Sequence, residues 1–395
     1  MVNAKKRILS IDILRGLVMV IMALDHTRDF FHNNGNAMAD PMDPETTTLF
    51  LYLTRWLTHF CAPTFVFLSG ISAYLSAKNK EPKQASNFLI KRGIWLLFVE
   101  IILITLGLTF NPFYNFIILQ VIWAIGWSMI LLGVLSRISH RLVLIIGLLL
   151  FFGHNLLNLI HLPDPTTLGG SLISILFTTS AKIIPIDSEH LIGDFYAILP
   201  WTGAMLLGFS IGKWYESTFD ASKRKRLLFY SGLTLLISFL VLRYFSWYGN
   251  PTPRKEYAAQ LQTVFDFFNV SKYPPSLQYF GMTLGPSLML LAGIENIKNW
   301  FSKVMIVYGK VPFFYYVLHF YLLHAALVLF FFANGYGADQ INTAGSPFLF
   351  RPNDFGYTLP IVYLIWLSAV ALLYQPCIWF QKYKAKHQQW WLSYL

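Results

Sequence analysis

Apolar stretches about as long as a membrane span, roughly 20 residues, recur along the whole chain and limit what it can fold into. They fall at 8–31, 49–77, 88–109, 113–135, 142–160, 195–214, 227–246, 276–295, 303–332 and 357–381. Hydrophobic residues make up 55% of the chain and charged residues 12%, against about 25% charged in a typical soluble domain. Because a bilayer can solvate so much apolar surface, we expect an all-α, polytopic bundle of about ten transmembrane helices.

The distribution of Lys and Arg predicts the orientation of these spans. Most of the 30 Lys and Arg residues fall in the short connections and span ends on one side, and the bias alternates loop by loop. Cytoplasmic segments are the ones enriched in Lys and Arg, so both termini are predicted to be cytoplasmic. The same rule accounts for the net charge of +11, and no compact basic domain indicates nucleic-acid binding.

The connections on the other side are longer and carry Pro, Gly, Asn and Asp, which are typical of turns. They span 32–48, 161–194, 247–275 and 333–356. Long ordered loops often carry function. Since no soluble domain and no clear internal repeat interrupts the pattern, residues 1–395 are interpreted as a single transmembrane domain.

The two cysteines, Cys61 and Cys377, both fall inside apolar stretches. The spans that hold them place the two thiols at different depths, so we expect buried free thiols and no disulfide. Neither a His-x-x-x-His nor a Glu-x-x-His pattern occurs within a span, and we therefore expect no metal site.

Asp12 and Arg15 lie near the cytoplasmic end of the first apolar stretch. Residues three apart on a helix share a face, so these two side chains can form an ion pair inside the bundle. Contact with a cytoplasmic ligand is the alternative. Gly16 follows directly and permits close approach of another backbone or of a ligand.

A dense group of titratable residues occupies the outer end of the same stretch: Asp25, His26, Arg28 and Asp29. An ionisable side chain in hydrocarbon is costly and is kept where it meets a partner or a watery cavity. The group is either a helix end solvated by water and headgroups or part of a functional site. We favour a functional site because the second stretch supplies matching groups at a similar depth.

Arg55 and His59 are those matching groups. They lie four residues apart on one face of the second stretch, and Pro63 just beyond them can kink the helix. A carboxylate beside a histidine orients the ring and makes it more basic, as a general base requires. The sequence therefore predicts a compensated polar site between the first two spans. Asp25 and His26 supply one side of it, and the matching pair supplies the other.

Polar residues of other spans are expected at the same level. These are Gln120, His154, Asn155, Asn158, Arg243, His319 and His324. A lone histidine in a bundle is more often a satisfied structural residue than a catalyst, so their shared level is the informative feature. Glu100 lies near the middle of its span, and no role is assigned to it.

Several segments of the chain resemble a known family. RILSIDILRGLVMVIMALDH at 7–26 and THFCAPTFVFLSGISAYL at 58–75 are similar to the catalytic domain of heparan-α-glucosaminide N-acetyltransferase and its bacterial relatives. Later segments look like the bacterial branch: QVIWAIGWSMI, GHNLL, LPWTGAMLLGFSIG, KYPPSLQYFGMTLGPSLMLL and GKVPFFYYVLH. The resemblance is most specific at the N-terminal Ser-x-Asp-x-x-Arg-Gly and touches most of the chain.

This resemblance implies a transmembrane acyltransferase. Such an enzyme moves an acetyl group from cytosolic acetyl-CoA to a sugar amine or hydroxyl on the other side of the membrane. The implied partners are acetyl-CoA as the acyl donor, a saccharide or lipid-linked acceptor and membrane lipids, with no nucleic acid. A basic cytoplasmic face suits the anionic nucleotide, and a His-rich outer layer suits proton transfer. A homodimer is one arrangement left open.

The family's site residues carry over only in part. Asp25 falls near an asparagine of the family, and the family's catalytic histidine falls near Asn36 in this chain. His26 and His32 are the local substitutes, and His59 falls where the family often has an acid. The departure leaves the acceptor and the identity of the base open.

Direct acyl transfer is the mechanism that we expect. His26, held by Asp25 and aided by His59, would deprotonate the acceptor, and Arg55 would stabilise the developing oxyanion. Arg15 and nearby cations would attract the phosphates of CoA. The residues predicted to bind the donor are Asp12, Arg15, Gln120, Arg243 and His319. Gly70 and Gly126 would leave room for the pantetheine arm between helices.

Two other classes of function stay open. A proton-coupled small-molecule transporter or exporter would use the same buried charges as a proton relay, and it predicts substrate flux without CoA. A structural or assembly partner within a membrane complex predicts little effect from single polar substitutions in this layer.

Overall fold

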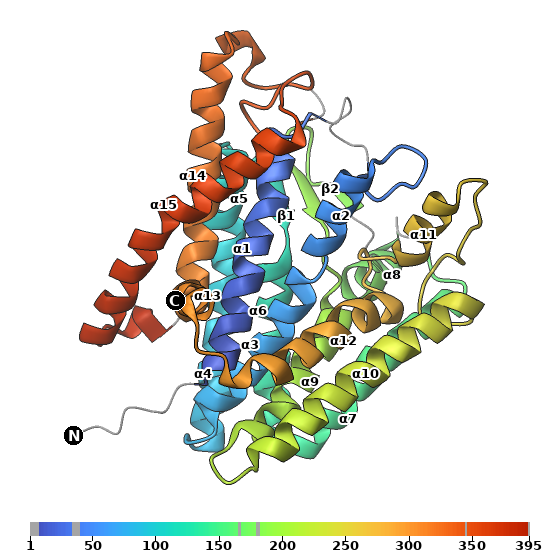
Figure 1. Cartoon of the computed structure of the whole chain (residues 1–395), viewed down its shortest axis with the longest axis vertical. Helices are drawn as coiled ribbons and strands as arrows, with labels where there is room; N and C mark the ends of the chain where they lie inside the picture. The colour runs from blue at the N-terminus through green and yellow to red at the C-terminus, as the bar shows by residue number, and fades with distance from the viewer. Residues whose placement is uncertain (1–7, 34–39, 165–166, 179–181, 344–345, 394–395) are drawn as a thin grey trace.

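The computed structural model describes residues 8–33, 40–164, 167–178, 182–343 and 346–393, which form a bundle of helices (Figure 1). Helix α1 (Leu9–Phe31) runs through the middle of the bundle and is buried along most of its length. It contacts α2 (Leu49–Thr58), α3 (Cys61–Ala77), α13 (Trp300–Lys310), α14 (Pro312–Ala333) and α15 (Leu359–Lys386). Asp12, Asp25 and Arg28 are therefore buried inside the protein, whereas Asp29 is exposed.

The remaining elements follow in chain order. The first half of the chain adds α4 (Pro82–Val99), the π-helical turn η1 (Glu100–Ile104), α5 (Thr105–Thr109), β1 (Phe116–Leu119), α6 (Val121–Ile138), α7 (His140–Gly153), η2 (His154–Leu159), α8 (Leu168–Ile173) and η3 (Ser174–Thr178). The second half adds β2 (Lys182–Pro185), β3 (Leu191–Asp194), α9 (Ile198–Ile211), η4 (Gly212–Tyr215), α10 (Ala221–Phe245), α11 (Gln260–Phe268), α12 (Leu277–Gly293), η5 (Ile294–Asn296), η6 (Ala338–Gln340) and η7 (Trp390–Ser393).

Within the described chain, 7 helical segments are long and apolar enough to cross a membrane. They are Leu49–Ala77, Val121–Ile138, His140–Leu159, Ala221–Phe245, Leu277–Asn296, Pro312–Ala333 and Leu359–Lys386. Large apolar side chains such as Leu149, Leu329 and Leu364 are exposed on the outside of these helices. The expected helical, multi-pass architecture is therefore confirmed.

A small three-stranded sheet departs from the all-α expectation. β1 pairs with β3 in parallel, and β2 pairs with β3 antiparallel. The run 113–135, expected as a single span, contains β1, and its helix α6 starts only at Val121. A short apolar run cannot be assigned to strand or helix by periodicity alone, so pairing with a distant segment decides its conformation.

The run 303–332, also expected as a single span, forms two helices. α13 ends at Lys310, and α14 begins with Pro312. Proline has no N–H and its ring clashes with the preceding turn, so it fits the first turn of a helix and not the interior. The break leaves the end of α13 packed against α1.

Pro63 interrupts the second apolar stretch, as expected. α2 ends at Thr58 and α3 begins at Cys61. Because Pro63 has no N–H, the carbonyl of His59, four residues earlier, lacks its helical partner. Tyr279 of α12 donates its hydroxyl to that carbonyl at 2.8 Å. The kink thus binds the α2–α3 junction to α12 and holds His59 in place.

Two glycines set the crossing of α1 with α13. A Cβ built on Gly16 would lie 1.9 Å from the carbonyl oxygen of Met305, and a Cβ on Gly309 would lie 1.8 Å from that of Asp12. Only residues without a Cβ allow the two backbones to approach so closely. The glycine of the Ser-x-Asp-x-x-Arg-Gly segment therefore serves helix packing.

Gly70 and Gly126 also lie at helix crossings, which corrects the expectation that they leave room for a ligand arm. A Cβ on Gly70 would lie 2.1 Å from the carbonyl oxygen of Met205 in α9, and one on Gly126 would lie 3.0 Å from that of Gly93 in α4. The backbone of a neighbouring helix fills the space at both positions.

We expect Gly16→Ala to lower the free energy of unfolding by about 1–3 kcal/mol, the usual cost of overpacking a core. The added Cβ meets the backbone of α13, which cannot yield as a flexible side chain can. Gly153→Ala is the matched control, because nothing lies within 4 Å of a Cβ at that position. Thermal unfolding of the purified protein in detergent measures both, and equal midpoints for the two variants would contradict the tight crossing.

Candidate active site

Two adjoining cavities lie beside the C-terminal half of α1. The central cavity has a volume of about 250 Å³ and is lined by α1, α2, α3, the start of α6 and loop segments. The vestibule, of about 570 Å³, is lined mostly by loop residues. Some residues line both cavities, and we call this set the shared wall. It consists of Asp29, Arg55, Phe195, Lys272, Tyr273, Pro347 and Phe348.

Asp25 binds two guanidinium groups between the first two apolar stretches. Its Oδ1 lies 2.9 Å from Arg28 Nη1, and its Oδ2 lies 2.5 Å from Arg55 Nη1. Thr58 donates its hydroxyl to Oδ1 at 2.9 Å. Arg28 Nη2 also lies 2.6 Å from Asp29 Oδ1. The predicted contact between the two stretches, Asp25 with Arg55, is therefore present.

His26 lines the central cavity, but its carboxylate neighbour differs from the expected one. Its Nδ1 lies 3.9 Å from Oδ2 of Asp29. Adjacent helical residues point about 100° apart, whereas residues three apart share a face. Asp25 and His26 thus point in different directions, and Asp29 is the carboxylate within ion-pair distance of the ring.

His319 packs against His26 from α14. The two ring centroids lie 5.3 Å apart, and Phe320 contacts the His26 ring at 4.5 Å. The Nδ1 of His319 lies 2.5 Å from the Tyr316 carbonyl oxygen, and because a carbonyl only accepts, Nδ1 carries the hydrogen. Its Nε2 is buried and has no hydrogen-bond partner in the described chain. His319 is absent from the described cavity linings, so its donor-binding role stays a prediction.

His59 lines the vestibule, whereas His26 lines the central cavity. Its ring packs edge-on against Tyr279, with centroids 5.6 Å apart. Its buried Nδ1 has no hydrogen-bond partner among the residues that the structure describes. The two histidines therefore face different cavities, and His59 can assist His26 only across the shared wall.

His32 follows the last residue of α1. Burial, together with the nearby charges of Arg28 and Arg351, lowers the pKa of His32 to about 4. The ring is therefore neutral at neutral pH, but it lines none of the described cavities. Asn36, the position expected to match the family's catalytic histidine, lies outside the described residues.

Gln120 lines the central cavity at the start of α6. Glu100, whose role was open at the level of sequence, accepts the backbone N–H of Gln120 at 2.5 Å. Its carboxylate therefore stands at the N-terminus of α6, where helix N–H groups lack partners and negative charge is favourable. Glu100 supports the wall of the central cavity from behind.

His154 and Asn155 hold the turn that follows Lys272. His154 Nε2 lies 2.8 Å from the carbonyl oxygen of Pro275. The backbone N–H of Leu277 donates to Asn155 Oδ1 at 2.7 Å. These polar residues of the fifth apolar stretch therefore support a loop that reaches the shared wall.

A third cavity, the basic cavity, lies beside the N-terminal half of α1 and has a volume of about 180 Å³. Its charged lining residues are all cationic: Arg15, Arg92, Lys310 and Lys384. Asp12 pairs with Arg15 at 3.3 Å, as predicted, and Arg15 also donates to Gly309 O at 3.1 Å and Ser72 Oγ at 2.5 Å. Asp12 thus positions Arg15 and does not itself line the cavity. Clustered cations of this kind suit phosphate groups.

Phe65 lines both the basic cavity and the central cavity. Arg15 and His26, which mark the two cavities, are ~16 Å apart along α1 at ~1.5 Å per residue. A ligand with an anionic head and a long, thin arm matches this separation. Phe65 is the residue that the two cavity linings share.

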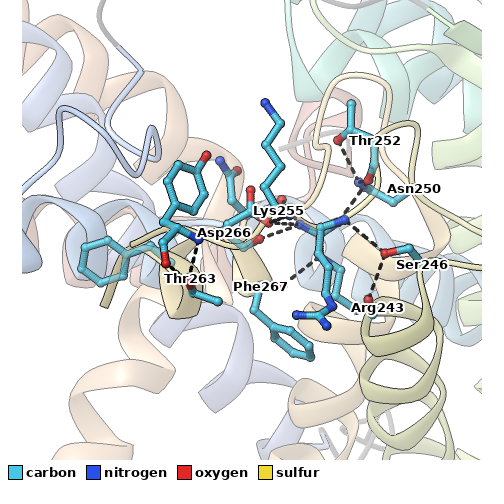
Figure 2. Close-up of polar contacts among 12 residues, drawn as sticks. Arg243, Ser246, Asn250, Thr252, Lys255, Thr263, Asp266 and Phe267 are labelled. Carbon is cyan, nitrogen blue, oxygen red and sulfur yellow. Dashed lines mark hydrogen bonds and ion pairs between the residues drawn. The ribbon is translucent and has the colours of Figure 1, made fainter. Parts of the chain in front are cut away.

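Arg243 anchors an outer loop and lines none of the described cavities. Figure 2 shows its guanidinium group enclosed by the 246–269 segment. It donates to the carbonyl oxygens of Phe267 and Thr252, each at 3.1 Å, and to that of Asp266 at 2.6 Å. It also pairs with Asp266 Oδ2 at 3.0 Å. These contacts correct the expectation that Arg243 binds the donor, because loop oxygens already use its N–H groups.

The site residues that sequence reasoning missed come mostly from loops. Phe195, Lys272, Tyr273 and Phe348 belong to the shared wall, yet helical periodicity does not reach them. The Lys-Tyr-Pro-Pro segment at 272–275 belongs to the resemblance described above, but nothing in the segment itself indicates a cavity. Only packing between distant parts of the chain brings these residues to α1.

The bundle of long apolar helices, with polar cavities between them, defines a multi-pass membrane protein. The catalytic-domain family of heparan-alpha-glucosaminide N-acetyltransferase matches residues 7–248, and the chain belongs to this family. The suspected relationship is therefore confirmed, and the coarse activity that the family suggests is that of a membrane acetyltransferase. No curated protein sequence matches the chain. Asp25, His26 and Arg55 lie within the matched segment, whereas Lys272 and His319 lie beyond it.

We expect Arg243→Gln to loosen the outer loop and to leave donor binding unchanged. Removing one partner of a buried ion pair costs about 3–5 kcal/mol, and the variant also loses the carbonyl contacts of the loop. Limited proteolysis should therefore cut the 247–269 segment faster, while the affinity for CoA stays within about twofold of wild type, a difference below 1 kcal/mol.

Lys255→Gln is the control for this variant, because it removes a charge from an exposed side chain of the same loop and keeps the backbone N–H that contacts Asp266 Oδ2. Weaker CoA binding by Arg243→Gln without faster cleavage of the loop would restore the donor-binding role.

Proposed function

We propose that this protein acetylates a saccharide or lipid-linked acceptor on the outer side of a bacterial cytoplasmic membrane, using cytosolic acetyl-CoA. The observation that carries the proposal is the succession of cavities along α1. The basic cavity contains the cationic Arg15, and the central cavity contains His26 beside Asp29. Family membership supports acetyl transfer as the reaction class.

The proposal includes an orientation with about ten spans and both termini in the cytoplasm. This orientation directs the basic cavity toward the cytoplasm, and it agrees with the enrichment of Lys and Arg in cytoplasmic segments. The vestibule then opens toward the outer loops. Donor and acceptor would reach the central cavity from opposite sides.

The basic cavity fits the phosphate end of acetyl-CoA. Arginine and lysine form charge-assisted hydrogen bonds to phosphate oxygens, and the charged residues that line this cavity are all cationic. The phosphates would bind there, and the pantetheine arm would pass Phe65 to bring the thioester into the central cavity. Ser69 and Ser72 add hydroxyl groups to the cavity wall.

His26 is the proposed general base. The acceptor nitrogen or oxygen forms a bond to the acetyl carbonyl carbon while its proton passes to His26. The C–S bond then breaks, and the thiolate takes the proton back. Arg55 would stabilise the oxyanion, because it lines the central cavity. A guanidinium group has five N–H donors, and the contact with Asp25 uses only part of them. Asp29 would orient the His26 ring.

A proton-coupled transporter is the second candidate. The same succession of cavities favours it, since the ion-pair network of Asp25 lies between the central cavity and the vestibule. It predicts flux of a small molecule through proteoliposomes in the absence of CoA. The acetyltransferase predicts transfer of label from acetyl-CoA in detergent, where no transmembrane flux exists.

We expect His26→Ala to lower acetyl transfer by at least about 100-fold, the usual contribution of a general base. His59→Ala should lower it less, because His59 lines the vestibule. The assay follows labelled acetyl-CoA and glucosamine with the purified protein. His190→Ala is the control, since His190 lies in an outer loop and pairs with Asp187 at 2.9 Å. Wild-type turnover in His26→Ala would remove the base from this mechanism.

We expect Lys384→Gln to weaken CoA binding by about tenfold, because losing one charge-assisted hydrogen bond costs roughly 1.5–3 kcal/mol. Lys382→Gln is the matched control: it removes the same charge two residues away on α15, from an exposed side chain outside the basic cavity. Isothermal titration of CoA into each variant measures the affinity. Equal losses in both variants would mean that the general basic charge of this face, and not the cavity, attracts the ligand.

A further inference from the structure

Lys272 is a buried cation at the boundary of the two outer cavities. The residue is 9% exposed, and it lines both the central cavity and the vestibule. Its ammonium lies 5.0 Å from the ring centroid of Tyr273 and 6.0 Å from that of Tyr196. Aromatic faces attract a cation without neutralising its charge.

The other cations of the vestibule are already matched by oxygen atoms. Arg28 and Arg55 share the carboxylate of Asp25. Arg351 donates to the carbonyl oxygen of His32 at 2.7 Å and also contacts carbonyl oxygens of Asp29, Pro352 and Phe355. The N–H groups of these arginines therefore already have oxygen partners within the protein.

Lys272 differs from them. In the described ranges of the chain, no carboxylate oxygen of an Asp or Glu lies within 4.0 Å of the Lys272 ammonium, so Lys272 forms no ion pair there. The residues outside those ranges include no Asp or Glu that could supply one. Asp29 shares the wall with Lys272, and Asp40 lines the vestibule, but neither forms an ion pair with it in the described chain. A buried cation without a direct ion-pair partner is energetically costly, and an incoming anion relieves that cost.

The backbone around Lys272 is held rigidly. The N–H of Ser271 donates to Asn250 Oδ1 at 2.9 Å, and the N–H of Ser276 donates to Ser271 O at 3.0 Å. The contacts of His154 and Asn155 described above hold the following turn. Hydrogen bonds therefore hold the loop that places the Lys272 ammonium beside the two cavities.

We propose that Lys272 is a specificity-determining residue that binds a carboxylate or phosphate group of the acceptor. This inference rests on the proposed acetyltransferase function and names the acceptor class: molecules that carry a negative charge near the group to be acetylated. An anion bound at the shared wall leaves the rest of the acceptor free to reach the central cavity, where His26 lies. The aromatic rings of Phe195, Tyr273 and Phe348 in the same wall offer apolar faces to a sugar ring.

The test compares three amino sugars as acceptors with labelled acetyl-CoA. Glucosamine lacks an anionic group, glucosamine 6-phosphate carries a phosphate, and muramic acid carries a carboxylate. Wild type should show a KM for at least one charged sugar about tenfold or more below that for glucosamine, the effect of one charge-assisted contact. The two charged probes distinguish phosphate from carboxylate recognition. A wild-type enzyme without preference for either charged sugar would overturn the proposal.

The preference should depend on the charge at position 272. Lys272→Met is expected to raise KM for the preferred charged sugar about tenfold with little change in kcat, so that the difference in KM between this sugar and glucosamine disappears. Lys272→Arg should keep the preference, which separates loss of charge from misfolding. Lys255→Met is the control, because Lys255 is exposed on the loop before α11. An equal fall in kcat for all three sugars in Lys272→Met would assign the residue to the reacting centre and overturn the specificity role.

Binding without a donor separates this inference from the proposed function. Isothermal titration of glucosamine 6-phosphate and muramic acid into the wild-type protein and Lys272→Met requires no acetyl transfer. If the charged sugars bind only when Lys272 is present and the protein acetylates none of the sugars, the anion site is supported and the acetyltransferase function is contradicted. Acetyl transfer with equal binding by wild type and Lys272→Met would keep the enzyme and remove the anion site.

Discussion

The carboxylate of Asp25, placed between Arg28 and Arg55, is the interaction on which the site depends. Two guanidinium groups so close together would repel each other, and because both side chains are largely buried, water screens their charges weakly. The shared carboxylate compensates both and ties α2 to α1. Because Arg55 lies in the shared wall, the same ion pair sets the boundary between the central cavity and the vestibule.

Most other polar residues of this layer serve as supports for loops. His324 lies between the carbonyl oxygens of Leu108 and Leu349, which are 2.9 and 3.0 Å from its two ring nitrogens. Arg243 and Arg351 donate to carbonyl oxygens of the loops around them. A buried polar group has to find a partner, and loop carbonyls supply one. Few groups then remain to face the cavities. His26, Arg55 and Lys272 do so, and these carry the proposed chemistry and specificity.

The contact between the first two spans could be predicted because depth along a helix follows from residue number. Asp25 and Arg55 therefore meet as expected. Orientation around the helix was harder to judge: the adjacent Asp25 and His26 diverge, and Asp29, one turn on, is the neighbour of the imidazole. Periodicity also could not separate α13 from α14 or identify β1, since both outcomes depend on partners distant in sequence.

The sequence by itself determined the helical, membrane-embedded class, the family and the pairing of buried charges on α1. Hydrocarbon cannot solvate polar groups, so composition and spacing constrain these features strongly. Only the tertiary structure decided which polar side chains face a cavity and which support a loop. The role of a polar side chain depends on where distant loops pack. Lys272 belongs to the shared wall, and the turn that follows it is held by His154 and Asn155. No local sequence pattern predicts these contacts.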